Sequence, residues 1–185
     1  LKTMRINRPE KSDYPEYYEK YIAKVAGNPL DELVANHKTL RRMVSRLSRK
    51  QLNYRYAEGK WTIKEILVHL IDGERVFCYR ALRFARKDTT PLPGFEENEW
   101  VPNSNAGNRK LRSILREFDA VRKSTIELFS NMNKEMLNSS GIANGQPISV
   151  RSILFVIAGH EMHHMRIMLE RYIEKSYVPP LVTGA

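Results

Sequence analysis

Four long segments with the 3.6-residue periodicity of amphipathic helices constrain this chain more than any other feature of its sequence. They span approximately residues 29–48, 62–87, 108–131 and 149–175, and shorter polar or Pro/Gly-rich stretches separate them. Alternation of the β type never persists long enough to predict a sheet. The chain is therefore predicted to be all-α, a four-helix bundle with additional short helices, one of them before Gly27.

Local signals mark where two of these helices begin and where one connection lies. Thr62 and Glu65 form a capping box in the sequence TIKE, and Ser149 is a suitable N-cap for the last helix. Prolines and glycines interrupt residues 87–107, which excludes a continuous helix there. At roughly 20 residues this loop is long for a compact domain, and such loops are commonly functional.

Length and composition predict one domain with a core. We expect residues 1–28 to form an N-terminal extension with a short helix, residues 29–175 the bundle, and residues 176–185 a C-terminal tail. No apolar run approaches the roughly 20 residues that span a bilayer, and the N-terminus lacks the apolar core of a secretory signal. Cys78 is the single cysteine and cannot form an intrachain disulfide. A cytoplasmic location without membrane contact follows as an expectation.

The net charge of +10 raises the question of nucleic-acid binding. The basic residues gather in residues 38–50 and again in residues 80–87, the latter including Arg80, Arg83 and Arg86. No pattern of a known nucleic-acid-binding motif is recognisable, and aromatic residues are not interleaved with the basic ones as a stacking platform requires. A solvated basic face is favoured over a nucleic-acid interface.

Three of the five histidines lie in the stretch GHEMHH, residues 159–164. On a helical wheel at about 100° per residue, His160 lies at the edge of the apolar arc and His164 about 40° inside it, while His163 lies about 60° toward the polar face. His160 and His164 are thus the better pair of metal ligands. A third ligand is needed, and His69 sits at the edge of the apolar arc of the second long helix. Histidines satisfied by carbonyls and water are the alternative, and His37 is expected to be solvated.

Two carboxylates share the inward faces of these helices. Glu161 lies near the middle of the apolar arc of its helix, and Glu74 has a similar position on the second helix. Either could orient a ligand imidazole or act as a base, with Glu161 the candidate catalytic residue. The alternative, favoured for both, is a buried structural acid paired with an arginine or a tyrosine hydroxyl.

The stretches WTIKEILVHLIDGE at 61–74 and GHEMHHM at 159–165 together resemble the DinB/YfiT-like superfamily of bacterial four-helix-bundle proteins. The resemblance extends from about Leu30 to about Ile173. It implies a divalent metal, usually zinc or nickel, and by position it assigns the metal to His69, His160 and His164. It also implies a metal-dependent transferase or hydrolase, because relatives include thiol-dependent S-transferases and proteins named as metal-dependent hydrolases.

The leading hypothesis from the sequence is a metal-dependent enzyme that acts on a small molecule, with a low-molecular-weight thiol as a candidate co-substrate. A nucleic-acid-associated damage-response protein and a non-catalytic metal-binding bundle are the alternatives. The resemblance also implies a homodimer. We expect the loop between Lys87 and Asn108 to shape the mouth of the site, although it leaves its helix at the end opposite His69, which argues against contact within one chain.

Overall fold

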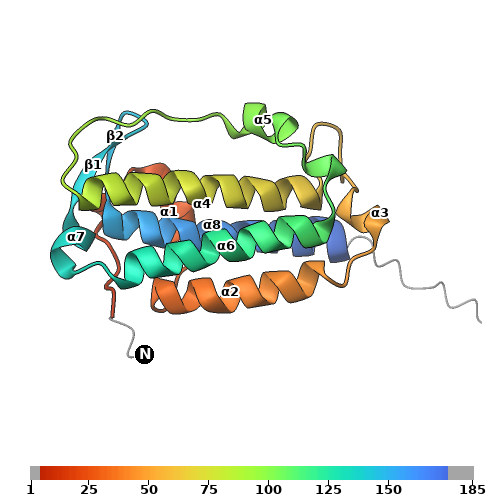
Figure 1. Cartoon of the computed structure of the whole chain (residues 1–185), viewed down its shortest axis with the longest axis horizontal. Helices are drawn as coiled ribbons and strands as arrows, with labels where there is room; N and C mark the ends of the chain where they lie inside the picture. The colour runs from red at the N-terminus through yellow and green to blue at the C-terminus, as the bar shows by residue number, and fades with distance from the viewer. Residues whose placement is uncertain (1–4, 175–185) are drawn as a thin grey trace, which may run out of the picture.

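Four long helices form a bundle in the computed structural model, which describes residues 5–174 (Figure 1). They agree with the predicted segments, and differ mainly at their ends. The first is shorter than expected, and a separate one-turn helix follows it. The last continues beyond its α-helical part as a π-helical turn, and its expected end near residue 175 lies outside the described residues. The four helices are α2 (Pro29–Val44), α4 (Ile63–Ala85), α6 (Leu111–Ser130) and α8 (Val150–Met168).

The predicted helix starts are held by side-chain caps. In the capping box of α4, the Glu65 backbone N–H donates to the Thr62 hydroxyl at 3.2 Å, and the Thr62 backbone N–H donates to the Glu65 carboxylate at 2.6 Å. The Ser149 hydroxyl accepts the backbone N–H of Ser152 at the start of α8. Each cap satisfies a backbone donor that the first helical turn leaves without a partner, so both long helices begin where the sequence indicates.

Each helix of the bundle packs against two others: α4 and α2 both contact α6 and α8. The chain runs along the bundle in α2 and returns in the opposite direction in α4. It then enters α6 in the same direction as α4, because the connecting loop returns along the length of the bundle (Figure 1). α8 runs back antiparallel to α4 (Figure 1). Apolar side chains at helical spacing fill the interior between the four helices, among them Leu33, Leu40, Leu67, Ile71, Ile114, Phe118, Ile153 and Val156.

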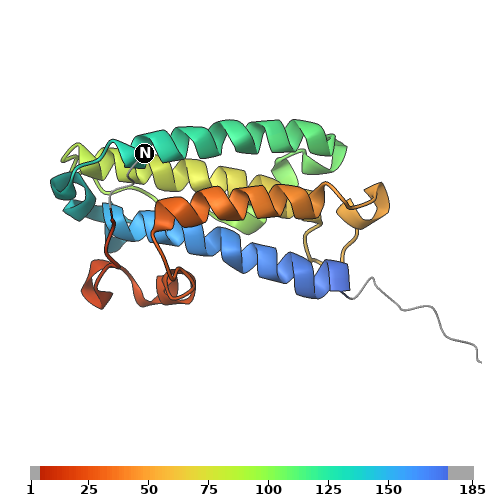
Figure 2. The same cartoon turned by 90° about the horizontal axis from the view of Figure 1, so that it is seen from below.

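The segment before α2 packs against the outside of α8 (Figure 2). Ile22, in the short helix α1, is fully buried there. Gly159 allows this close approach, because a Cβ atom at that position would lie 2.0 Å from the backbone oxygen of Tyr21. The short helices of the chain are η1 (Lys11–Asp13), η2 (Glu16–Tyr18), α1 (Glu19–Ile22), α3 (Arg49–Leu52), α5 (Glu97–Trp100), η3 (Val101–Asn103), η4 (Ala106–Asn108), α7 (Lys134–Asn138) and the π turn η5 (Leu169–Ile173).

The prediction that no sheet forms is wrong at one place, between α7 and α8. Strands β1 (Ser140–Ala143) and β2 (Gln146–Ser149) form an antiparallel hairpin. Asn144 and Gly145 make its two-residue turn, both with positive φ, 52° and 72°, which is the geometry that favours Asn-Gly. Leu92 pairs with Ala143 beside this hairpin, so the hairpin fixes the start of the long loop to the bundle.

None of the helices in residues 5–174 has both the length and the apolar character that a membrane span requires.

Candidate metal centre

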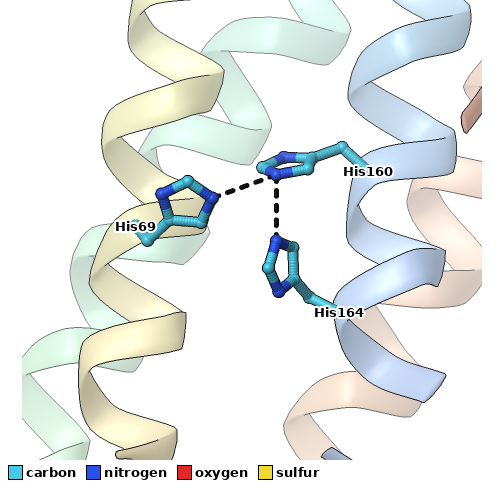
Figure 3. A group of neighbouring side chains, drawn as sticks. All are labelled: His69, His160 and His164. Atoms are coloured by element: carbon cyan, nitrogen blue, oxygen red, sulfur yellow. Dashed lines mark hydrogen bonds between the residues drawn. The ribbon is translucent and has the colours of Figure 1, made fainter. Parts of the chain in front are cut away.

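Three histidine side chains from two antiparallel helices converge on one point inside the bundle (Figure 3). His69 extends from α4, and His160 and His164 extend from successive turns of α8. The Nε2 atoms of His69 and His160 lie 3.0 Å apart, and those of His164 and His160 lie 3.1 Å apart. The structure therefore brings together the three residues that the sequence selects, and all three are buried.

Hydrogen bonds between the three imidazoles do not fully explain this arrangement. A neutral imidazole has one N–H donor and one acceptor nitrogen, so the single Nε2 of His160 cannot make a full hydrogen bond to both neighbours at once. A divalent cation would accept all three lone pairs. Metal–nitrogen bonds of about 2.0–2.1 Å at tetrahedral angles imply nitrogen separations of about 3.3 Å, close to those between these rings. The donor set thus fits a metal with three imidazole ligands.

The surroundings of the three rings keep them uncharged. Burial lowers the pKa of His69 to about 4 and that of His164 to about 3. Burial also lowers the pKa of His160 well below its usual range, and the other two histidines add to the shift. At neutral pH all three imidazoles are therefore neutral and able to donate a lone pair to a cation.

Packing around the rings sets their positions. Gly73, one turn after His69, lies beside the His160 ring, where a Cβ atom would be 3.6 Å from its Cε1. The ring of Tyr21 also packs edge-on against that of His160, with ring centroids 5.2 Å apart. The Trp61 ring lies 4.8 Å from that of His69, so this residue flanks the cluster rather than only anchoring the core. Within residues 5–174, the buried Nδ1 of His164 has no hydrogen-bond partner.

A cavity of about 280 Å³ opens onto the three histidines. The segment before α2 forms one wall and the loop after α4 another; the expectation that this loop shapes the mouth of the site is borne out within a single chain. The loop does leave α4 at the end opposite His69, but it then runs back along the length of α4, so it can reach the site of its own chain (Figure 1). The walls include Tyr17, Tyr18, Lys20 and Tyr21 from the first segment, Gly94, Phe95 and Glu97 from the loop, and Trp61, Phe77 and Arg80.

The other two histidines lie outside the cluster. His163 borders the cavity and contacts the Tyr21 ring, at 5.4 Å between centroids, but does not join the three converging nitrogens. The expectation that His37 is solvated is wrong. Its Nε2 lies 2.8 Å from an oxygen of Asp119, and its Nδ1 lies 4.0 Å from Glu161. His37 is thus largely enclosed between α2 and α6, and burial lowers its pKa.

The two inward acids are both paired with one arginine, as the structural alternative predicts. Arg122 of α6 donates to both oxygens of Glu74 at 3.0 and 2.8 Å and to Glu161 at 2.9 Å. It also donates to the backbone oxygen of Leu33 at 2.7 Å. Burial raises the pKa of Glu161, although Arg122 offsets part of the shift. Glu161 lies beside His160 in sequence but contacts Arg122, and a catalytic role for Glu161 stays a prediction.

The cavity contains residues that the sequence-based prediction of the site did not include. Tyr18, Tyr21 and Arg80 line it but are absent from the predicted ligand and catalytic residues. Arg80 had been grouped with exposed basic residues, yet only 4% of it is exposed. A signal existed: Phe77, Arg80 and Phe84 share one face of α4 at spacings of three and four residues, and both phenylalanines are buried.

Comparisons with known proteins agree with this architecture. The sequence profile of the DinB superfamily matches residues 32–168, which include all three converging histidines. A protein of Oceanobacillus iheyensis, provisionally named a metal-dependent hydrolase, is 27% identical over 125 residues, or 66% of this chain and 70% of the relative. A Geobacillus kaustophilus protein with the same provisional name is 27% identical over 150 residues, 79% of each chain.

Among solved structures, YfiT from Bacillus subtilis superposes with a TM-score of 0.72, covering 92% of this chain and 94% of its own at 18% identity. YfiT is itself provisionally called a metal-dependent hydrolase and is described as having an unusual four-helix-bundle topology. In the present chain, α4 and α6 run in the same direction, which differs from a simple up-and-down bundle. The profile match over most of the chain, together with this shared fold, places the protein in the DinB superfamily.

Proposed function

We propose that this protein is an enzyme that holds one divalent metal ion through His69, His160 and His164 and acts on a small molecule. The observation that carries the proposal is the convergence of three neutral, buried imidazoles at the base of a cavity. Three protein ligands with access from a cavity are typical of catalytic rather than structural zinc sites, which use four. The provisional names of the relatives support the same reading.

The residues of this chain supply binding and orientation. The three imidazoles would hold the metal, and the ring of Tyr21 packs edge-on against that of His160. A bound divalent ion would act as a Lewis acid and lower the pKa of a group that coordinates it. The aromatic walls of the cavity, among them Phe77 and Phe95, limit the water around a bound substrate.

We propose hydrolysis as the reaction, and transfer to a thiol as the alternative reaction at the same metal site. The names of the curated relatives favour hydrolysis, whereas the resemblance noted from sequence also implies a thiol co-substrate. The chain's own thiol is a poor nucleophile: burial raises the pKa of Cys78 to about 12, and its sulfur contacts Thr125 at 3.2 Å. A thiol used in the reaction would therefore come from a second small molecule. Zinc and nickel are the metals we propose to test first.

Metal analysis of protein purified without an affinity tag tests the first part of the proposal. We expect one divalent ion per chain, lost on replacement of His69, His160 or His164 by alanine. His163→Ala is the matched control, because His163 is the neighbour of His164 and stands outside the cluster. Retention of stoichiometric metal by His164→Ala, with loss in His163→Ala, would overturn the ligand assignment.

A panel of small esters and amides, assayed with and without added thiols, tests the reaction. We expect turnover that chelation abolishes and that the returned metal restores. Turnover that requires a thiol would favour transfer, and turnover without one would favour hydrolysis. Activity unchanged by chelation, or equal in wild type and His164→Ala, would contradict a metal-dependent enzyme.

A further inference from the structure

Arg80 is a buried cation without an anionic partner in the wall of the cavity. It lies on α4 with 4% of its surface exposed, and it borders the same space as the three histidines. Its Nη2 donates to the backbone oxygen of Pro93 at 2.7 Å. No carboxylate within residues 5–174 forms an ion pair with it. Arg122, the other buried arginine of the bundle, has two.

The remaining contacts of Arg80 do not neutralise it. Its guanidinium lies 5.9 Å from the ring centres of both Phe77 and Phe95. Such cation–π contacts compensate only part of the hydration that an arginine loses when it leaves water without a counter-ion. The Pro93 carbonyl occupies one of five N–H donors. Among the described residues, the other nitrogens have no partner, and they are not sealed off from the cavity.

The acidic residue in the cavity wall, Glu97, does not neutralise Arg80. Glu97 lines the same cavity but forms no ion pair with Arg80 among residues 5–174. Its charge acts on the pKa of His69 instead, which it raises slightly against the effect of burial. Water in the cavity can accept hydrogen bonds from the remaining N–H groups, but only an anion from outside the protein would also neutralise the charge of the guanidinium.

We propose that Arg80 binds a carboxylate of the substrate while the reacting group of the same molecule lies at the three histidines. The planar fork of an arginine matches a carboxylate with two parallel hydrogen bonds. The walls beside it, Phe77, Phe95 and Tyr18, suit an apolar or aromatic body, and the volume of about 280 Å³ limits the ligand to a small molecule. The substrate class is a small organic acid. This proposal deepens the proposed function and rests on it.

Benzoate and its neutral analogue benzamide are suitable probes, because they share a shape and differ in charge. We expect benzoate to bind the wild-type protein, measured by NMR titration, and benzamide to bind at least about tenfold more weakly. Titrations on chelator-treated protein keep the carboxylate from binding through the metal. Undetectable benzoate binding at tens of millimolar, or equal binding of the two probes, would overturn the proposal.

Variants of α4 locate the binding on Arg80. Arg80→Gln is expected to lower benzoate affinity at least about tenfold and to leave benzamide unaffected. Arg83→Gln is the matched control, since Arg83 lies one turn further on and pairs with Asp88; it should bind benzoate like wild type. Equal benzoate affinity in Arg80→Gln and wild type would contradict the assignment.

Two further measurements keep the outcome decisive. Arg80→Lys keeps the charge but loses the planar fork, so we expect an intermediate affinity. If Arg80→Gln fails to fold, Arg80→Lys still tests the location, because a benzoate affinity equal to that of wild type in Arg80→Lys would contradict the assignment. A protein that binds benzoate through Arg80 but holds no metal would refute the proposed function alone, whereas one that holds metal but does not distinguish the probes would refute this inference alone.

Discussion

Arg122 stabilises two carboxylates at once, and few side chains in the bundle are as constrained. Glu74, Glu161 and the backbone oxygen of Leu33 all accept hydrogen bonds from its guanidinium, and 3% of its side chain is exposed. The group links α6 to α2, α4 and α8 through a single residue. The stability of the bundle should therefore depend on it strongly.

Replacing Arg122 by methionine is expected to lower the free energy of unfolding by about 3–5 kcal/mol, because two buried carboxylates lose their counter-ion. Urea unfolding followed by circular dichroism measures the change. Arg75→Met is the control: Arg75 is half-exposed and pairs with Glu117 on the surface, so its loss should cost at most about 1 kcal/mol. Equal losses in the two variants would show that the buried group contributes no more than a surface pair.

The three buried imidazoles predict that the metal-free protein loses stability as the pH falls. In the unfolded chain histidine takes up a proton near pH 6.5, whereas burial lowers the native pKa of His69 to about 4 and that of His164 to about 3. The unfolded state therefore binds more protons between these limits. The contribution of these histidines to the free energy of unfolding is fully present above pH 6.5. Below that pH it falls, for each histidine, by up to about 1.4 kcal/mol per pH unit.

Urea unfolding of chelator-treated protein at pH 7.5 and pH 5.5 measures this dependence. Glu161 acts in the opposite direction: burial raises its native pKa, so its contribution falls as the pH rises. Comparison with His69→Phe removes that effect, because both proteins contain Glu161. We expect the loss of stability between the two pH values to be smaller in His69→Phe. An identical loss would indicate that burial does not keep His69 neutral at pH 5.5.

The sequence predicted the histidine cluster but not the residues around it, for a physical reason. His69, His160 and His164 lie on inward faces of long helices, where the 3.6-residue period places them reliably. The contacts of Tyr21 and Phe95 depend on how a short segment and a loop fold over the bundle, and no local period encodes that. For Arg80, sequence alone could not show whether a carboxylate lay opposite.

Among the elements, the loop between α4 and α6 best shows how a connection can be misread. The sequence predicts that it shapes the mouth of the site, but its start at the end of α4 opposite His69 argued against contact within one chain. Two helices that run in the same direction need a connection as long as themselves, and 23 residues of α4 span about 35 Å. A loop of roughly 20 residues can cover that distance in extended form. Its length was thus itself the signal of a parallel connection.

The hairpin before α8 was missed although its turn has a strong local signal. Asn-Gly between two short segments favours a type I′ turn, and positions 144 and 145 have that sequence and positive φ values. Four residues per strand are too few for an alternating pattern to emerge. The Asn-Gly dipeptide, rather than the periodicity, is the sequence feature that predicts this hairpin.

The contact between α1 and α8 depends on the absence of a side chain at Gly159. Alanine is favoured over glycine inside a helix by about 0.8–1.0 kcal/mol, yet here its Cβ would lie 2.0 Å from a backbone oxygen of Tyr21. Because backbone atoms cannot move aside as a flexible side chain does, we expect Gly159→Ala to destabilise the protein by at least about 1 kcal/mol.

Urea unfolding tests this change against Gly107→Ala. A Cβ atom at Gly107 meets no other atom within 4 Å, so that variant should stay within about 0.5 kcal/mol of wild type. Stabilisation by Gly159→Ala would mean that helix propensity outweighs the contact, and that α1 separates readily from the bundle.

For the molecule as a whole, the expected homodimer is a proposal that rests on the resemblance and on the frequency of twofold pairs among soluble oligomers. The cavity walls described above come from one chain. Sedimentation velocity at micromolar concentration should give about twice the mass of one 21.6 kDa chain. A single species of one chain's mass would remove the proposal without affecting the metal site.

The tyrosines before α2 and the converging histidines lie in different parts of the chain, the first lining a wall of the cavity and the second lying at its base. The profile of the superfamily matches residues 32–168, which contain every converging histidine, whereas Tyr17, Tyr18 and Tyr21 precede the matched residues. One wall of the cavity and the three imidazoles therefore come from different parts of the chain. A change in the leading segment is therefore expected to alter what the cavity accepts and to leave the three converging histidines in place.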